Sequence, residues 1–235
     1  MIKGLYISKN GMMPPRKMMD ILSNNLANMN TIGFKKSKAV FHELIDEASD
    51  PDKIVQQVTV FEKGALRETG NPLDLALTGE GYFVVNTPVG EVYTRNGNFT
   101  IDGEGRLVTQ DGYSVMGTGG EIFLNGQDFT ISDDASIMVQ EQVMDHLRVV
   151  RFKNPEALEQ ISGAYFSDKD NAAAVELPPE EISVKTGFLE GSNVTGMAEI
   201  IEMIEIFRQF EFAQKAIQSQ DQTLEKLIND AGRVL

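Results

Sequence analysis

The stretch LSNNLANMNTIGFKK, residues 22–36, decides the fold of this chain because it contains both a helical pattern and its end. Apolar residues recur here three and four positions apart, at Leu22, Leu26 and Met29, which is the spacing of an amphipathic helix. Asparagines are poor helix formers that favour caps and turns. Asparagine and glycine also tolerate the left-handed conformation of a helix C-cap, so the pattern predicts a helix that ends between Asn30 and Gly33.

The same spacing extends upstream and predicts one N-terminal helix. Its apolar positions are Leu5, Met12, Met19, Leu22, Leu26 and Met29, with Ser8 and Pro15 in the gaps. An interior proline lacks a hydrogen-bond donor and clashes with the preceding turn. We therefore expect a kink at Pro14 and Pro15, or a helix that restarts with Pro15 as its first residue.

Residues 194–229 carry the strongest helical pattern, since they lack proline and are rich in Glu, Gln, Lys, Ala and Ile. Alternating three and four spacing defines a coiled-coil seam of Met203, Ile206, Phe210, Ala213, Ile217, Gln220, Leu224 and Leu227. Further apolar residues lie outside this seam, at Ile200, Ile201, Ile204, Phe207 and Phe212. A helix of this kind is marginal alone in water, so it needs several neighbours.

Residues 73–139 have a different character, with short apolar runs separated by glycine turns. Turn dipeptides typical of hairpins occur at Asn96-Gly97, Asp102-Gly103, Asp111-Gly112 and Asn125-Gly126. Such spacing predicts an antiparallel sandwich or barrel, which strands at 147–152 and 181–190 would close. Within 36–70, the run AVFHELIDEA (39–48) is compatible with a short helix, and QQVTVFEKGAL (56–66) with an extended connection.

The predicted fold class is therefore α+β, with a sandwich- or barrel-like β domain and two terminal helices that pair as a coiled-coil stalk. The expected divisions are an N-terminal helix at 1–35, an extended connection at 36–70, a β-rich domain at 71–188 and a C-terminal helix at 189–235.

Composition excludes several function classes. With 35 acidic and 21 basic residues, the formal charge of −14 argues against nucleic acid as a partner. The basic cluster Lys35, Lys36 and Lys38 is interpreted as a solvated helix end favoured by the helix dipole. There is no cysteine, which excludes disulfides and thiolate chemistry. No apolar run is long enough for a membrane span, and the N-terminus lacks the pattern of a secretory signal.

Catalytic and metal-binding patterns are equally weak. The two histidines, His42 and His146, have no ligand partners at metal-site spacing, which disfavours a zinc site or a serine triad. The acidic loop DGEG (102–105) lacks the ligand pattern of a calcium loop and is interpreted as a hairpin turn. GTGGE (117–121) does not follow the phosphate-binding pattern. We therefore predict no enzyme activity, no cofactor and no metal.

Three motifs identify a family resemblance. LSNNLANMNTIGFKK (22–36) closely resembles the N-terminal signature of flagellar basal-body rod and hook proteins. The segments 79–117 and 187–227 are similar to the β region and the C-terminal helix of the same family, in the same order. NPLDLAL (71–77), MGTGGEIFLN (116–125) and LEGSNV (189–194) resemble the proximal rod type, F, most, with the distal type, G, as runner-up. The proline pair and TGMAEI (195–200) depart from the family pattern.

The resemblance implies a structural rod subunit that transmits motor torque through the periplasm to the hook. It implies export by the flagellar type III apparatus without a cleaved signal peptide, and location in the basal body. Implied partners are copies of itself, other rod proteins, the surrounding ring proteins and the export apparatus. In members of the family, the two terminal helices are disordered in the free subunit and become ordered on assembly into an inner helical layer, with the β domain outside.

The implied subunit interface lies in both helical segments. Its residues are Leu22, Asn24, Asn25, Leu26, Asn28, Met29, Gly33, Phe34, Met203, Ile206, Phe210, Ile217, Leu224 and Leu227. On this interpretation, Asn25→Ala or Gly33→Val impairs assembly but leaves the β domain folded. The alternatives for the seam are an intramolecular two-helix core or a free-standing coiled-coil adaptor, and a carbohydrate hydrolase is the enzyme alternative for the β domain.

Overall fold

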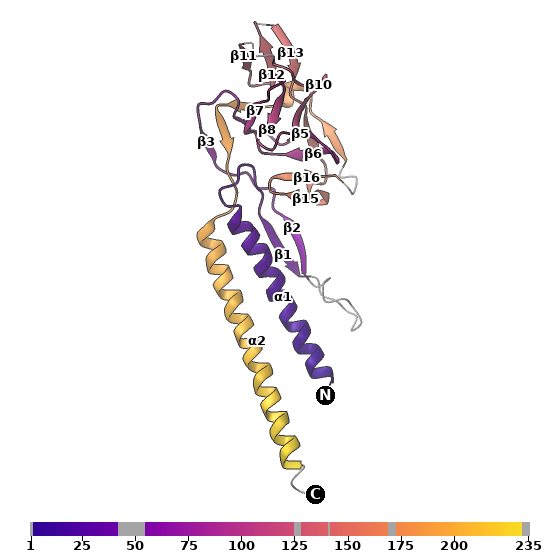
Figure 1. Cartoon of the computed structure of the whole chain (residues 1–235), viewed down its shortest axis with the longest axis vertical. Coiled ribbons are helices and arrows are strands. Elements are labelled where there is room, and N and C mark those ends of the chain that lie inside the picture. The colour runs from indigo at the N-terminus through magenta and orange to yellow at the C-terminus, as the bar shows by residue number, and fades with distance from the viewer. Residues whose placement is uncertain (1, 42–54, 125–127, 141, 169–172, 232–235) are drawn as a thin grey trace. The chain divides into compact units, whose positions relative to one another are not determined.

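A computed structural model of the chain describes residues 2–41, 55–124, 128–140, 142–168 and 173–231. The chain divides into two compact units. Unit 1 comprises residues 1–27, 37–58 and 195–235, and unit 2 comprises residues 28–36 and 59–194. Each unit therefore combines parts of the chain that are far apart in the sequence, as the colours of Figure 1 show.

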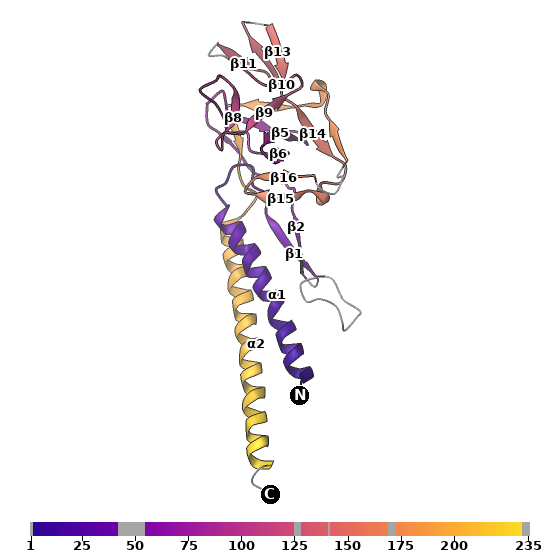
Figure 2. The same ribbon diagram turned by 45° about the vertical axis from the view of Figure 1, so that its right-hand side comes forward.

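Unit 1 contains the two long helices, α1 (Ile2–Ala27) and α2 (Gly196–Ala231). They run side by side in both views of the chain (Figures 1 and 2). The predicted C-terminal helix at 194–229 is thus confirmed, whereas the N-terminal helix ends at Ala27, before the predicted end between Asn30 and Gly33. Coiled-coil pairing of the two helices stays a prediction.

α1 continues through Pro14 and Pro15 without an interruption, so the predicted restart at Pro15 is wrong. A proline removes one hydrogen bond from the helical ladder, and the bonds on either side still hold the backbone in the α conformation. The helix ends at Ala27, and Gly33 in the following turn has a positive φ of 69°. The left-handed glycine expected at the end of this segment is confirmed.

Unit 1 also holds a two-stranded sheet of β1 (Ser37–Phe41) and β2 (Val55–Thr59). The interpretation of 39–48 as a helix is wrong for Ala39–Phe41, which belong to β1, and residues 42–48 lie outside the described part of the chain. The β-branched Val40 and aromatic Phe41 suit an extended strand, which tertiary pairing with β2 stabilises.

Unit 2 is built on a curled, half-barrel sheet of ten strands among the described residues. Its main path runs through β15 (Glu159–Ser162), β16 (Tyr165–Ser167), β6 (Gly90–Thr94), β5 (Tyr82–Thr87), β9 (Ser114–Gly117), β8 (Leu107–Thr109) and β7 (Phe99–Ile101). β10 (Gly120–Glu121) pairs with β9, while β14 (Val149–Phe152) pairs with β5 and with β17 (Ala174–Glu176). All these pairs are antiparallel, which confirms the α+β class.

Smaller sheets complete unit 2. A three-stranded sheet contains β11 (Phe129–Ile131), β12 (Ser136–Val139) and β13 (Gln142–His146). Two-stranded ladders join β4 (Leu75–Leu77) to β18 (Val184–Thr186), and β3 (Leu66–Glu68) to β19 (Phe188–Glu190). Short 3₁₀ turns follow Asn154 and Pro178, at Pro155–Ala157 and Pro179–Glu181. The segment 181–190, predicted to be extended, thus joins two ladders.

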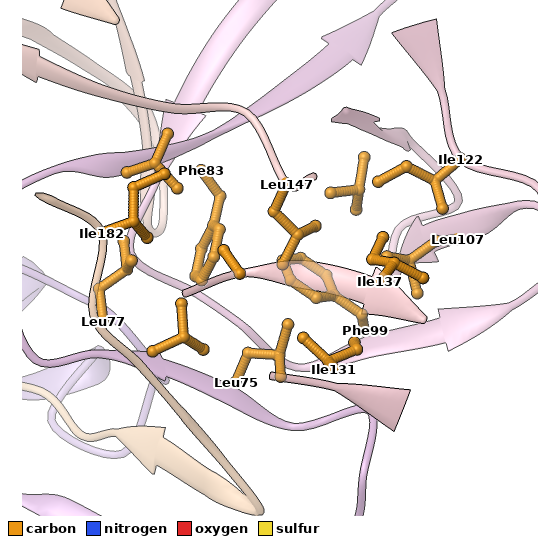
Figure 3. Close-up of a cluster of buried hydrophobic side chains, with 14 of the residues drawn as sticks. Leu75, Leu77, Phe83, Phe99, Leu107, Ile122, Ile131, Ile137, Leu147 and Ile182 are labelled. Atoms are coloured by element: carbon orange, nitrogen blue, oxygen red, sulfur yellow. The ribbon is translucent and has the colours of Figure 1, made fainter. Parts of the chain in front are cut away.

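β5 is central because both of its faces are buried. Phe83 packs into the larger apolar cluster, shown in Figure 3, whereas Tyr82 and Val84 belong to a second cluster. Successive side chains of a strand point to opposite faces, so the apolar run YFVV supplies two cores at once. The larger cluster includes Leu75, Leu77, Phe99, Leu107, Ile137, Leu147 and Ile182.

The predicted hairpin turns have mixed outcomes. Asp102-Gly103 and Asp111-Gly112 connect the neighbouring pairs β7–β8 and β8–β9, as predicted. The hairpin prediction for Asn96-Gly97 is wrong, because β6 and β7 are not neighbours in the sheet. The carbonyl of Gly97 accepts a hydrogen bond from the N–H of Leu75, so this turn contacts β4, a strand of another sheet. Asn125-Gly126 lies outside the described residues.

Candidate functional site

In unit 1, one asparagine joins three segments. The side chain of Asn25 is 1% exposed, and its Nδ2 donates to the carbonyl of Ser37 and to Oε2 of Glu199, each at 2.9 Å. Its Oδ1 accepts the N–H of Ser37 at 2.9 Å. A carboxamide can donate and accept at the same time, so a single side chain ties α1 to β1 and to the first turn of α2.

Glu199 is favoured at this position for two reasons. It is 3% exposed and belongs to the first turn of α2, where exposed backbone N–H groups attract negative charge. Its hydrogen bond with Asn25 fixes the face of α2 that turns toward α1. Residues seven positions further on share that face, and Ile206 there is 2% exposed.

In unit 2, the end of the opening stretch is buried and not part of a helix surface. Phe34 and Lys35 are 2% and 1% exposed, and the N–H of Gly33 donates to the carbonyl of Glu190 at 2.7 Å. A Cβ built on Gly33 would lie 2.4 Å from the backbone nitrogen of Asn96. Both this close approach and the positive φ require glycine at position 33.

Lys35 and Glu190 form a buried ion pair. Lys35 Nζ lies 2.5 Å from Glu190 Oε1 and donates to the carbonyl of Glu62 at 2.6 Å. Glu190 Oε1 also accepts the N–H of Gly64 at 3.0 Å. A Cβ on Gly64 would lie 1.8 Å from the carbonyl oxygen of Gly191, so only glycine lets these backbones approach so closely. Burial lowers the pKa of Lys35, an effect that Glu190 opposes.

Arg95 supplies a second buried positive charge beside this pair. Its guanidinium lies 3.7 Å from Glu190 Oε2 and donates to the carbonyls of Leu77 and Gly79. It also lies over the ring of Tyr82, 5.4 Å from the centroid. Within the described residues, Glu190 Oε2 and Arg95 Nε are buried without a hydrogen-bond partner. The cluster therefore has two positive charges around one carboxylate.

Asn193 connects the same segments through neutral hydrogen bonds. Its Oδ1 accepts the N–H of Lys36 at 2.7 Å, and its backbone N–H donates to the carbonyl of Phe34 at 3.4 Å. Its Nδ2 donates to the carbonyls of Val60 and Glu62 at 2.8 and 3.2 Å. Within unit 2, the motif LEGSNV (189–194) is therefore hydrogen-bonded to the motif GFKK (33–36).

The interpretation of Lys35, Lys36 and Lys38 as a solvated helix end is wrong for Lys35. The helix ends eight residues earlier at Ala27, and Lys35 is buried against Glu190. Lys38 is exposed, as the interpretation expected, but it lies on β1 and not at a helix end. A run of like charges in the sequence did not reveal that one member has a buried partner 155 residues away.

The predicted interface residues fall into three groups. Five are buried within the chain, at Leu22, Asn25, Gly33, Phe34 and Ile206. Seven are partly or largely exposed, at Asn24, Leu26, Asn28, Met29, Met203, Phe210 and Ile217. Leu224 and Leu227 lie on the α2 backbone, and their side chains are outside the described part of the chain. Their role between subunits stays a prediction.

α2 carries a second apolar face that the seam does not include. We call it the outer face and define it by Met197, Ile200, Ile201, Ile204, Phe207 and Phe212, which are 42–71% exposed. At about 100° per residue, this face lies opposite the face of Glu199 and Ile206 that turns toward α1. Large apolar side chains that gather on one exposed face mark interaction surfaces.

Sequence reasoning missed the polar residues that organise both units. Lys35, Arg95, Glu190, Asn193 and Glu199 were not among the predicted site residues, although four of them stand within the quoted motifs. Their partners are distant in the sequence, so periodicity could not reveal them. The available signal was a charged or amide residue within three positions of a glycine.

The described residues offer little for catalysis. They contain no group of three or more His, Cys, Asp or Glu side chains placed to hold a metal ion. Among the helices that the structure describes, none is long and apolar enough to cross a membrane. The geometry provides two buried polar clusters, one around Asn25 and one around Glu190. It also provides an exposed apolar face of α2 that suits binding to other helices.

Comparisons with known proteins agree with this layout. Residues 5–35 match the family described as "Flagella basal body rod protein", residues 76–142 match "Flagellar hook protein FlgE/F/G D1 domain", and residues 185–230 match "Flagellar basal body rod FlgEFG protein C-terminal". The three matches follow the order of the predicted motifs.

Full-length relatives extend the similarity to nearly the whole chain. Flagellar basal-body rod protein FlgG of Bacillus subtilis (strain 168) is 33% identical over 261 residues, which covers 97% of this chain and 99% of the relative. FlgG of Caulobacter vibrioides is 32% identical, with 95% and 97% covered. FlgF of Rhizobium meliloti (strain 1021) is 30% identical over 244 residues, with 97% and 98% covered. At this identity and coverage, the chain belongs to the flagellar basal-body rod protein family, whose members are structural subunits and not enzymes.

Proposed function

We propose that this chain is a subunit of the proximal rod, of the F type, that assembles helically and transmits motor torque through the periplasm to the hook. Membership of the rod family implies assembly with other flagellar rod components. The proposal adds a position in the rod and a surface through which assembly proceeds.

The observation that carries the proposal is the outer face of α2. Phe212 is 71% exposed and Ile204 48% exposed, although both are large apolar residues on a long helix. Burying each such side chain is worth roughly 1.5 to 3 kcal/mol. One face of α2 turns toward α1, so the opposite face is available for helices of neighbouring subunits. An interface between non-equivalent surfaces generates an open helical array, as a rod requires.

The interface residues are proposed accordingly. Exposed and partly exposed positions, such as Met29 and Phe210, contact neighbouring subunits together with the outer face. The buried positions, such as Leu22 and Asn25, hold α1 and α2 together within the subunit. The segments 1–35 and 189–235 are proposed to form the rod core, with 71–188 outside it and 36–70 as the connection.

The F type is favoured by alignment length. The alignment with FlgF of Rhizobium meliloti spans 244 residues, whereas that with FlgG of Bacillus subtilis spans 261, so the F-type relative aligns to this 235-residue chain with fewer gaps. The G type, the distal rod protein, is the second candidate, because the Bacillus subtilis FlgG has the higher identity of these two relatives.

Export and partners complete the proposal. The subunit leaves the cytoplasm through the flagellar type III export apparatus without a cleaved signal peptide. Its neighbours are copies of itself and other rod proteins, and the ring proteins of the basal body surround it. Ordering of the helices on assembly limits polymerisation before export, since the cost of ordering is met only when the partner surface is present.

Complementation tests the proposal. The gene is expressed in strains that lack either the F-type or the G-type rod protein, and swimming and purified basal bodies are examined. We expect rods and swimming to return in the F-type deletion. Ile204→Glu places a charge on the outer face, so we expect that variant to restore neither, because a buried unpaired charge is strongly unfavourable.

Gln209→Glu is the matched control, since it adds the same charge to an exposed position of α2 away from the outer face. It should restore swimming like the wild type. Restoration of the G-type strain alone would support the second candidate. Intact rods assembled by Ile204→Glu would contradict the proposed role of the outer face in assembly. Intact rods in a strain deleted for this gene would contradict the rod function itself.

A further inference from the structure

The chain enters and leaves the body of unit 2 through two segments that are held together by polar contacts. Residues 33–36 follow the turn after α1, and residues 190–193 precede α2. The backbone bond from Gly33 to Glu190, the ion pair of Lys35 with Glu190 and the bond from Lys36 to Asn193 join them. We call Lys35, Glu190 and Asn193 the polar lock.

A third segment, residues 60–64, completes the polar lock. The carbonyl of Glu62 accepts from both Lys35 and Asn193, and the N–H of Gly64 donates to Glu190. Lys35 and Glu190 thus contact each other and the third segment, while Asn193 contacts the third segment and the backbone of Lys36. Closing it requires three stretches of chain, about 30 to 160 residues apart, to dock in one register.

The charges make this closure all-or-none. Lys35 and Glu190 are each 1% exposed, so burying the charge of one without the other is unfavourable. Glu190 Oε2 has no hydrogen-bond partner among the described residues, and Arg95 at 3.7 Å adds a second positive charge. A buried pair of this kind adds little net stability, but loss of one partner leaves an uncompensated charge in the interior.

We propose that the polar lock is a conformational checkpoint, which holds the two helix-bearing ends of unit 2 together only when the β strands of unit 2 are folded. Arg95 at the end of β6 and the segment at 60–64 complete the lock, so an unfolded unit 2 cannot close it. With the lock open, residues 33–36 and 190–193, from which the chain continues toward the two helices, are no longer held together. This inference rests on the proposed function, since the checkpoint acts on assembly.

Hydrogen exchange on the full-length, unassembled protein tests the lock directly. In Glu190→Gln the shape is kept and the charge is lost, which leaves Lys35 unpaired. We expect amides in peptides covering 28–36, 60–66 and 188–194 to exchange roughly 100-fold faster or more. Peptides covering β5 and β6 should keep the wild-type rate, because the lock opens without unfolding the sheet.

A double variant separates a lock from ordinary packing. Lys35→Met alone should also open the lock, but less than Glu190→Gln does, because Arg95 remains 3.7 Å from the Glu190 carboxylate. Lys35→Met combined with Glu190→Gln should recover part of the protection, since Lys35 then no longer lies buried without its carboxylate. Glu91→Gln is the matched control. It removes a carboxylate that pairs with Arg148 at 2.8 Å on the exposed surface of the same unit, and it should change nothing.

Wild-type exchange rates in Glu190→Gln, or single effects that simply add in the double variant, would overturn the checkpoint. If Glu190→Gln does not fold, Asn193→Ala replaces it, because that change removes neutral hydrogen bonds only. It should accelerate exchange about tenfold in the same three peptides, and unchanged rates would again overturn the inference. The exchange measurement needs no assembly, so it stands even if the wild-type protein builds no rod and the proposed function fails.

Discussion

At the scale of single residues, Gly33 shows why the opening stretch is restricted. It has a φ of 69°, and a Cβ there would meet the backbone of Asn96 at 2.4 Å. Because Gly33 packs against the β domain itself, we now predict that Gly33→Val also destabilises that domain. Its position in a helix stop signal explained the conformation, and the tertiary structure adds the contact.

Gly33→Ala should destabilise unit 2 by more than conformational strain alone. A left-handed alanine costs about 1–2 kcal/mol, and the steric clash adds about 1–3 kcal/mol. Gly112→Ala is the control, since Gly112 has a φ of 83° and nothing within 4 Å of the added Cβ. Denaturant unfolding of both variants measures the difference. Equal losses of stability would show that the contact with Asn96 contributes nothing.

At the scale of elements, α2 has two apolar faces with different environments. Ile206 is 2% exposed on the face toward α1, and Ile204, two residues earlier, is 48% exposed on the outer face. Helical periodicity predicted the seam and the wider apolar surface together. Which face the subunit itself covers depends on α1 and on the hydrogen bond between Asn25 and Glu199.

In dilute solution, we expect the helical circular dichroism signal to be weaker than complete helices of 26 and 36 residues would give, and to increase on assembly. The reason is that helices with only one face covered are marginally stable in water. Ile206→Ala should lower the dilute signal further, since truncating a buried isoleucine costs about 2–5 kcal/mol. Ile204→Ala, the matched control, should leave it unchanged. Fully helical, protease-resistant termini in the dilute wild type would contradict assembly-coupled ordering and favour the intramolecular two-helix core.

At the scale of the whole molecule, one buried and one partly buried tyrosine link stability to alkaline pH. Burial raises the pKa of Tyr82 and of Tyr165 above the usual value. In the unfolded chain a tyrosine loses its proton near pH 10. Above that pH the unfolded state binds fewer protons than the folded state, so stability is lost as the pH rises. The lowered pKa of Lys35 acts in the opposite direction.

Tyr82→Phe should therefore reduce the loss of stability between about pH 9 and about pH 11, because phenylalanine does not titrate. Urea unfolding at several pH values measures how the free energy of unfolding changes with pH. Lys35 is present in both the wild type and the variant, so its contribution cancels in the comparison. The phenylalanine ring keeps the contact with Arg95, which makes the substitution conservative. An unchanged slope would show that Tyr82 does not titrate differently in the folded state.

Much of the fold could be predicted because its signals are local. The 3.6-residue period located both helices, and turn dipeptides located the hairpins at Asp102-Gly103 and Asp111-Gly112. The same kind of signal failed at Asn96-Gly97, whose glycine bonds to Leu75 in another strand. A turn dipeptide specifies backbone conformation, but it does not specify which strand lies next to which.

The sequence by itself determined the two helices, the antiparallel β character of the middle and the rod family, since these depend on periodicity and short motifs. Only the tertiary structure decided that Lys35 is a buried partner of Glu190 and not a solvated charge. It also decided that Asn25 binds Ser37 and Glu199, and that α2 leaves one apolar face uncovered. The physical reason is that burial and pairing depend on contacts between distant segments, which local patterns do not encode.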